Sequence, residues 1–523
     1  MNKTLLFVFS LLSLSCFSQT GTIQGVVTFE NNPVEFATIS LQKSEQVEST
    51  KVDGKFSFQN IPFGKHQLLI SLLGYQEQAV WVELTEDKPT AQLSIALVEN
   101  EFALDEVVVS GTMKEISKRE SAVPIEVYSS TFFKACPAPS IFESIQNING
   151  VRPQLNCNVC NTGDIHINGL EGPYTMVLID GMPIVSGLST VYGLTGIPQS
   201  LIERVEIVKG PASTLYGSEA VGGIINVITK NPDNAPLFSA DVMGSSWLDL
   251  NLDLGLKLKA GNKATTLVGL NYFNYQNPID NNGDNFTDVT LQNRVSLFNK
   301  WNFKRKDNKV FTLAGRYLYE NRWGGEMQWS PEYRGGSDVY GESIYTNRWE
   351  AIGLYQLPIK EIVNFQFSAN GHEQNSVYGN TNFQASQYIG FGQFTWHKDI
   401  HQKHQLLSGI ALRYTYYDDN TTATSVGDSS NSVNAASKIL LPGIFVQDEI
   451  SFNSQNKMLL GMRYDYNQTH GSILSPRLNY KWNTFDQKHI VRVSVGNGYR
   501  VANIFTEDHA ALTGARTVEF IGE

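Results

Sequence analysis

One stretch decides the fold: IERVEIVKGPASTLYGSEAVGGIINVIT, from Ile202 to Thr229. Apolar and charged residues alternate in its first part, and its end is an apolar run rich in β-branched side chains. Both parts are therefore predicted to be strands. Between them lie Gly210-Pro211, Gly217 and Gly222-Gly223. Because glycine permits sharp turns and close contact between backbones, we expect a compact unit in which the two strands pack tightly.

The preceding sequence adds a predicted helix, APSIFESIQNINGV, which ends at Gly150, and the strand-like runs DIHINGL and YTMVLIDGMPI. In order and spacing, VLIDGMPI and the Ile202–Thr229 stretch resemble the plug domain of TonB-dependent outer-membrane receptors. The resemblance implies a plug domain over residues 119–232 and a transmembrane β-barrel around it.

Charged residues are interleaved with Ile202, Val205 and Ile207 on the first strand of this stretch. The resemblance implies that they contact charged groups on the inner wall of the barrel. An ordinary half-buried strand with one wet face is the alternative. The predicted plug–barrel contacts are Glu203, Arg204, Glu206 and Lys209.

Composition excludes some functions. The net charge of −11 provides no basic surface, so no nucleic-acid partner is expected. Residues 1–18 carry Lys3, a short apolar core and small residues, which predicts an export signal. Lipidation at Cys16 is the alternative. No other apolar run reaches the length of about 18 residues that a membrane helix needs. An exported chain of this kind is periplasmic, secreted or a β-barrel.

Residues 19–100 contain several alternating runs separated by turn signals, which predict a small β-sandwich. Gly25, Pro33 and Gly54, with neighbouring aromatic residues, resemble the carboxypeptidase-regulatory-like domain, which is not catalytic. The segment LDEVVVSGT, residues 104–112, is a short β-prone run suited to strand addition onto another protein. The family resemblance implies that it is the TonB box, formed by Asp105, Glu106, Val107, Val108 and Val109.

From residue 236 to 523 the pattern is that of barrel strands. LNLDLGLKL, KMLLGMRYDYN and LLSGIALRYTYY alternate apolar with polar or small residues, and tyrosines crowd the strand ends. We count about 13 candidate strands, joined alternately by short polar turns and by longer, more irregular stretches. Receptors of the resembled family use about 22 strands, so a C-terminally incomplete barrel is expected.

Candidate ligand residues follow from the resemblance, because the plug loops and barrel loops face the cargo. Tyr192 could stack on a flat ligand, and the long barrel loop, residues 321–344, is rich in aromatic residues that alternatively only pack the loop. The predicted ligand residues are Asn156, Asn158, Asn161, Ser189, Tyr192, Trp323 and Trp329.

Two further groups of residues are candidates for metal binding or for disulfide formation. DNNGDNFTD spaces oxygen ligands alternately, but Asn285 stands where an EF-hand has glycine. Calcium or an ordinary polar turn are the two interpretations for Asp280, Asn282, Asp284 and Asp288. Cys157 and Cys160 predict a loop disulfide in an exported protein. A soft-metal site with His166, or a disulfide with Cys136, stays open.

No set of residues with catalytic spacing is found, so no enzyme activity and no required cofactor are expected. The resemblance implies TonB-dependent import of a scarce metal complex across the outer membrane, with an iron–siderophore first and haem or cobalamin next. Its expected partners are TonB with ExbB and ExbD, the metal complex and outer-membrane lipid. A glycan importer, a passive porin and an adhesin are weaker alternatives.

Overall fold

The computed structural model describes residues 20–29, 32–42, 46–72, 75, 78–98, 107–157, 162–184, 188, 194–401, 403–426, 433–485 and 489–501. The predicted signal peptide, Asp105 and Glu106 lie outside this part of the chain. The chain divides into two compact units, Met1–Glu106 and Val107–Glu523. In the described residues no helix combines the length and the apolar character that crossing a membrane would require.

The first unit is the predicted β-sandwich. It consists of two four-stranded sheets, one with β1 paired to β2, β5 and β8, the other in the order β4-β3-β6-β7. Alternate side chains of both sheets, among them Ile23, Ile39 and Leu68, are completely buried in one core. The strands are β1 Thr20–Phe29, β2 Asn32–Pro33, β3 Thr38–Leu41, β4 Val47–Ser49, β5 Lys55–Pro62, β6 Gly64–Ser71, β7 Gln78–Leu84 and β8 Thr90–Ala96.

The second unit begins with the plug, whose central sheet has the order β11-β16-β17-β14-β15. Its elements are β9 Val107–Val108, β10 Ile116–Ser117, β11 Ile125–Ser129, α1 Ser130–Ala135, α2 Ile141–Ser144, η2 Ile145–Asn147, β12 Val151–Cys157, β13 Thr162–Ile167, η3 Gly172–Tyr174, β14 Thr175–Ile179, β15 Met182–Pro183, η4 Gln199–Leu201, β16 Ile202–Lys209, α4 Ser213–Tyr216 and β17 Gly223–Thr229.

The two strands predicted from the Ile202–Thr229 stretch are β16 and β17, which pair antiparallel in the middle of this sheet. At Gly223 the backbone passes so close to β16 that a Cβ atom would lie 2.3 Å from the carbonyl oxygen of Val208. Gly217 has φ +80°. Gly223 therefore needs glycine, as the motif predicted, and the positive φ at Gly217 favours it.

The predicted helix before Gly150 is shorter than expected. It comprises α2 and the single 3₁₀ turn η2, so it ends at Asn147. Ile148 is already extended, with φ −96° and ψ 124°, and β12 starts at Val151. The apolar pattern of the sequence continues past the end of the helix because Ile148 and Val151 are also buried in the plug core, although their backbone is extended and not helical.

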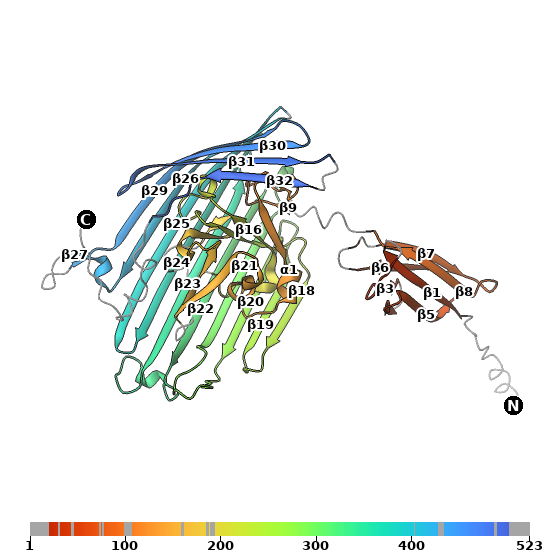
Figure 1. Ribbon diagram of the computed structural model, residues 1–523, viewed down its shortest axis with the longest axis horizontal. Helices are drawn as coiled ribbons and strands as arrows, with labels where there is room; N and C mark the ends of the chain where they lie inside the picture. Colours follow the sequence, from red (N-terminus) through yellow and green to blue (C-terminus); the bar gives the residue numbers. More distant parts are fainter. Residues whose placement is uncertain are drawn as a thin grey trace, which may run out of the picture. The chain divides into compact units, whose positions relative to one another are not determined.

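The barrel part is one antiparallel sheet of 13 strands in sequence order, as predicted. Figure 1 shows the plug elements, in orange and yellow, on the face around which this green-to-blue sheet curves. The strands are β18 Phe238–Gly244, β19 Leu250–Ala260, β20 Ala264–Tyr275, β21 Leu291–Phe303, β22 Phe311–Gly325, β23 Gly341–Gln356, β24 Ile362–Tyr378, β25 Thr381–Ile400, β26 His404–Asp419, β29 Ser437–Ser451, β30 Asn456–Asn467, β31 Gly471–Asn483 and β32 Ile490–Gly496.

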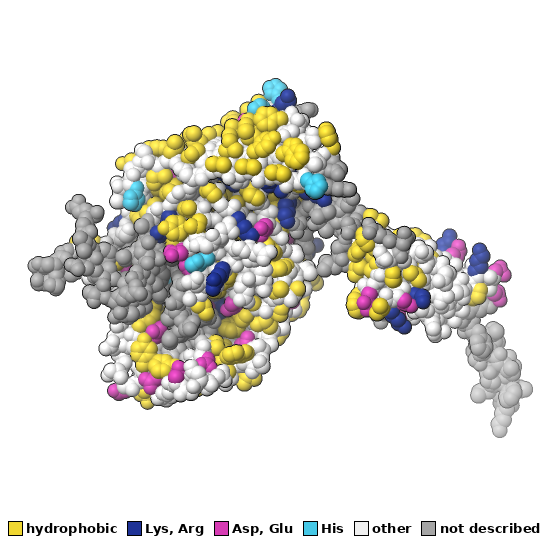
Figure 2. Space-filling view, viewed as in Figure 1, with side chains coloured by type: hydrophobic (Ala, Val, Ile, Leu, Met, Phe, Trp, Pro, Cys, Tyr) yellow, Lys and Arg dark blue, Asp and Glu magenta, His cyan; other side chains and the backbone are white. Residues whose placement is uncertain are grey.

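The two faces of the sheet differ as the alternation predicted. On β30, Leu459, Arg463 and Asp465 are buried toward the plug, whereas Leu460 and Met462 are exposed on the outside. Figure 2 shows hydrophobic side chains gathered over the β29–β32 part of the outer face. This exposed apolar surface is suited to contact with lipid.

Connections at the two ends of the sheet also differ. Six short turns, including residues 261–263, 357–361 and 401–403, lie at one end, and short turns mark the periplasmic end of a barrel. The other end carries all three longer connections, 276–290, 326–340 and 420–436, together with the short ones 245–249, 379–380 and 468–470. The loop predicted at residues 321–344 is shorter, because β22 and β23 remain paired as far as Gly325 and Gly341. Residues 420–436 contain η7 Thr422–Thr424, β27 Ser425–Val426 and β28 Val433–Asn434.

Candidate functional site

The described part of the predicted TonB box is held against the plug sheet. We call residues Val107–Ser110 the coupling segment. Val108 is completely buried and Val107 is 41% exposed, while β9 pairs with β10 through Val108 and Ile116. The segment therefore has one side chain anchored in the plug core and one that a partner can reach.

Glu206 on β16 binds this segment. Its Oε2 atom accepts hydrogen bonds from the backbone N–H of Val109 at 3.0 Å, from the N–H of Ser110 at 2.9 Å and from Ser110 Oγ at 2.7 Å. The carboxylate is completely buried. Hydrogen bonds to an ionised acceptor are the strong kind, contributing about 1.5–3 kcal/mol each.

Neighbouring residues complete the site. Arg204 Nε donates to Glu206 Oε1 at 2.9 Å, and Asn226 Nδ2 donates to Ser110 Oγ at 3.0 Å. The hydroxyl of Tyr216 donates to the carbonyl of Ser110 at 3.2 Å. Burial, and secondarily the Glu206 charge, raise the pKa of Tyr216, which keeps this hydroxyl a donor.

The four residues predicted to contact the barrel make their described polar contacts elsewhere. Arg204 pairs with Glu203 and Glu206, and Lys209 pairs with Glu126 and the carbonyl of Asn149. These described contacts lie within the plug, where β16 is placed between β11 and β17, and contact of the four residues with the barrel stays a prediction.

Other residues join the plug to the barrel wall. Lys300 on β21 pairs with Asp180 at 2.9 Å, and Arg413 on β26 pairs with Glu219 at 3.2 Å. Several wall arginines donate to plug carbonyls: Arg294 to Pro139, Arg316 to Thr195, Arg463 to Leu215 and Arg492 to Ser121. Sequence reasoning missed these residues. Their signal was a charge at an inward position of an otherwise amphipathic strand.

The predicted ligand residues fall into two groups. Asn158, Asn161, Ser189 and Tyr192 lie outside the described residues, as does the side chain of Asn156. Trp323 and Trp329 pack on each other with ring centroids 4.8 Å apart. Trp329 is 5% exposed and lies over Gly341, where a Cβ atom would be 2.3 Å from its ring. In this conformation both tryptophans pack the loop, and ligand contact by them stays a prediction.

The acidic loop stabilises its own backbone. Asp280 accepts hydrogen bonds from the N–H groups of Gly283 and Asn285, and Asp288 accepts from Asn281. Asn285 has φ +70°, the conformation in which an EF-hand uses glycine. No group of three or more His, Cys, Asp or Glu side chains in the described residues is arranged to hold a metal ion. Calcium binding by Asp280, Asn282, Asp284 and Asp288 stays a prediction.

The cysteine predictions fall largely outside the described part of the chain. Only the backbone of Cys157 is described, in β12, and Cys160 is not described. Cys136 is a free thiol. His166 Nε2 lies 3.0 Å from the Asp164 carboxylate, which provides it with a polar partner inside the plug.

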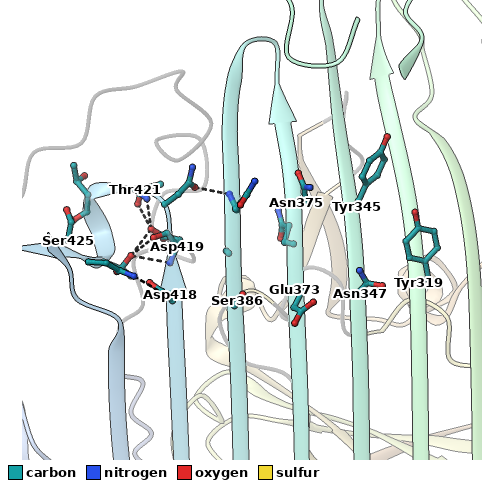
Figure 3. Close-up of a pocket in the computed structure, with 17 residues that line it drawn as sticks. Tyr319, Tyr345, Asn347, Glu373, Asn375, Ser386, Asp418, Asp419, Thr421 and Ser425 are labelled. Carbon is teal, nitrogen blue, oxygen red and sulfur yellow. Dashed lines mark hydrogen bonds between the residues drawn. The ribbon is translucent and has the colours of Figure 1, made fainter. Parts of the chain in front are cut away.

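A polar cavity of about 940 Å³ lies at the outer end of β22–β26. Figure 3 shows Asn347, Glu373, Ser386 and Asp418 lining it from successive strands. Three of these residues are cross-strand partners: Glu373, Ser386 and Asp418. Their neighbours along the strands, such as Gln387, are buried and face the plug, so the three side chains point away from the plug. Tyr388 donates to Glu373 at 2.9 Å just below it. The cavity therefore belongs to the outer rim, where an aromatic girdle meets the aqueous side.

A second cavity, of about 500 Å³, lies at the periplasmic end between plug and wall. Val109, Thr112 and Met113 line it from the side of the coupling segment, and residues of β23, β24 and β25 line it from the wall. Displacement of the coupling segment would enlarge this cavity directly.

Three family models match the chain in succession. They are the CarboxypepD_reg-like domain at residues 23–109, the TonB-dependent Receptor Plug Domain at residues 117–224, and the TonB dependent receptor-like, beta-barrel model at residues 229–512. The barrel model alone covers more than half of the chain.

Similar curated proteins have iron-related names. The iron-regulated outer membrane virulence protein of Vibrio cholerae is 24% identical over 386 residues, covering 68% of this chain and 55% of the relative. The ferric enterobactin receptor PirA of Pseudomonas aeruginosa is 33% identical over 175 residues, covering 31% of this chain and 22% of the relative. The chain thus spans about half the length of the first relative.

Solved structures share the fold. The siderophore receptor PirA from Pseudomonas aeruginosa superposes with a TM-score of 0.51 at 17% identity, covering 73% of this chain and 63% of that one. PirA from Acinetobacter baumannii gives a TM-score of 0.57 at 16% identity, with coverages of 73% and 62%. The chain has a plug, an amphipathic barrel wall and matches to both family models, which identify an outer-membrane protein of a class whose members are receptors and not enzymes. It therefore belongs to the TonB-dependent receptor family.

Proposed function

We propose that the protein imports an iron–siderophore complex across the outer membrane, driven by TonB with ExbB and ExbD. The observation that carries this proposal is the coupling segment, which Glu206 holds at the plug sheet next to the periplasmic cavity. Val107 is exposed and extended there, which suits strand addition by a periplasmic partner. A passive porin would need neither a plug nor such a segment.

The choice of cargo is supported by the relatives' names, which refer to iron regulation and to ferric enterobactin. A ferric siderophore therefore comes first, and haem or cobalamin second. Cargo would bind outside, weaken the contacts between Glu206 and the coupling segment, and release that segment to TonB. Pulling on the segment would then open a path between plug and wall.

Deletion of residues 105–111 tests energy coupling. We expect cells carrying the deletion to bind ⁵⁵Fe-labelled ferric enterobactin at the surface and to lose its accumulation. Val107→Pro, which removes one backbone donor, should act in the same direction, whereas Val107→Thr keeps the backbone and should import normally. Unchanged accumulation in the deletion variant would contradict energised import.

The cargo itself is tested by mass spectrometry of ligands retained by the protein from native outer membranes. We expect a ferric siderophore. Retention of haem or a corrinoid would move the proposal to the second cargo class, and retention of a glycan with no metal complex would refute it.

A further inference from the structure

The wall strand β24 differs from its neighbours in what it presents to the plug. From Gln366 to Ser376 every second residue is polar and almost completely buried, and only one of them can ionise. These inward residues are Gln366, Ser368, Asn370, His372, Gln374 and Ser376. We call them the β24 column. The inward positions of β23, by contrast, include the charged residues Arg348 and Glu350 and apolar ones such as Ile352.

Several polar atoms of the column and of the strands beside it are unpaired. The side-chain amide of Asn370 is 1% exposed, and neither its nitrogen nor its oxygen has a hydrogen-bond partner in the described structure. The same holds for both amide atoms of Gln387, the cross-strand partner of His372. Thr346 Oγ1, on β23 opposite Gln374, is unpaired as well.

Such groups are rare in folded proteins, because burying a polar atom without a partner costs free energy. These unpaired atoms do not result from a position at the edge of the sheet, since β24 is paired along its length with β23 and β25. On β22 and β23 the buried arginines are paired with carboxylates, since Arg316 and Arg348 both bond to Glu350, although Arg348 Nη1 has no hydrogen-bond partner in the described structure. The plug therefore contacts ion pairs on β22 and β23, and on β24 a nearly uncharged polar column whose Asn370 amide is unpaired.

The lower end of the column opens into the periplasmic cavity of about 500 Å³, which Gln366 helps to line. Gln393 joins the column to the residues after the coupling segment, because its amide nitrogen lies 2.8 Å from Gln366 Oε1 and 3.6 Å from Met113 Sδ. Removing residues 107–113 would uncover this end. Higher up, the plug meets the column through a hydrogen bond from Ser368 Oγ to the carbonyl of Pro183, at 3.1 Å.

We propose that the β24 column is the track along which cargo crosses the barrel once the coupling segment has been pulled away. Separation of the plug from β24 would expose the unpaired amides to water. The contact between plug and β24 should therefore open more readily than the contact between the plug and the ion-paired strands β22 and β23. The column would offer hydrogen bonds to hydroxyl, amide and carbonyl groups of a hydrophilic organic chelate. Nearly uncharged walls bind such a ligand weakly enough to let it move on. The inference rests on the proposed import function.

Cysteine labelling in living cells tests the track without knowledge of the cargo. In a background with Cys136, Cys157 and Cys160 changed to Ser, we place Ser368→Cys or Ser376→Cys on the column. Ser296→Cys is the matched control, because Ser296 is equally buried and faces the plug from β21. The probe is methanethiosulfonate ethylsulfonate added to intact cells.

In energised cells we expect both column cysteines to react about tenfold faster than in cells treated with a protonophore, because labelling follows the population of the open state. Val107→Pro should abolish the increase, and Ser296→Cys should stay protected. An equal or larger increase at Ser296→Cys, or none at Ser368→Cys in cells that import iron, would overturn the track. If the parent imports no ferric complex while the column still labels with energy, the cargo proposal fails and the track stands.

A second measurement separates transport from packing. Asn370→Leu removes an unpaired amide, so we expect a higher unfolding temperature, unchanged surface binding of ⁵⁵Fe-labelled ferric enterobactin and slower accumulation. Asn271→Leu is the control, because Asn271 bonds with Asn251, Asp253 and Arg294 and its loss should lower the unfolding temperature. Normal accumulation by Asn370→Leu would contradict the track.

Discussion

At the scale of single residues, one buried carboxylate organises the coupling site. Glu206 accepts three hydrogen bonds from Val109 and Ser110 and one from Arg204. Each of these bonds has an ionised partner, so together they form a strong attachment that can nevertheless be broken as one unit. A shift of β16 that moves Glu206 would release the coupling segment.

Glu206→Gln is therefore expected to free the segment without cargo. It removes the negative charge while keeping the shape, and the loss of about 1.5 kcal/mol from one charge-assisted bond corresponds to about tenfold. We expect the purified full-length variant to bind the periplasmic domain of TonB about tenfold more tightly in titration calorimetry. Glu203→Gln, an equal charge change on a half-exposed side chain, should have no effect. Equal affinities of Glu206→Gln and wild type would contradict the role of Glu206.

A second residue predicts a pH effect. Burial raises the pKa of Glu143 on α2, although the Arg294 charge and the Ser140 hydroxyl oppose the shift. A carboxyl with a raised folded-state pKa contributes stability that is present below its ordinary value of 4.5 and lost as the pH rises through the folded-state pKa. Glu143→Gln should therefore unfold at a higher temperature than wild type near neutral pH.

The difference should shrink as the pH falls below 4.5, where the wild-type carboxyl is protonated in both states. Calorimetric scans of the full chain at both pH values measure this, with the exposed Glu171→Gln as control. A stabilisation by Glu143→Gln that is independent of pH would show that another effect is responsible.

At the scale of elements, period-two alternation was enough to predict the strands and their faces. Loop bounds were less predictable, because β22 and β23 pair beyond the regular alternation as far as Gly325 and Gly341. The inward positions of these strands hold Arg316, Glu350 and Arg348, with Glu350 bonded to both arginines. Such a pairing depends on register, which a single strand does not encode.

Glu350→Gln should leave both buried arginines without a countercharge. We expect a loss of about 3–5 kcal/mol of unfolding free energy, the usual effect of breaking a buried ion pair from one side. Urea denaturation followed by tryptophan fluorescence measures it. Glu361→Gln, which breaks a solvent-exposed pair with Lys398, should leave the unfolding curve unchanged. Similar curves for both variants would refute the structural role of Glu350.

At the scale of the whole molecule, the first unit has a hydrophobic core of its own, made by residues between Ile23 and Leu97. We expect a fragment of residues 19–100 to fold alone and to unfold cooperatively, as followed by circular dichroism. Ile70→Asp places a charge in that core and should abolish folding. A fragment without a cooperative transition would show that the unit needs the rest of the chain.

The sequence by itself determined the class of the protein. Alternation defined the sandwich and the 13 barrel strands, and the glycines around Ile202–Thr229 identified the plug, because the close approach of backbones at Gly223 leaves no room for a side chain. Only the tertiary structure decided the partners. Glu206 meets Ser110, and Asn370 is left without a partner, because each pairing depends on segments far apart in the sequence being brought together.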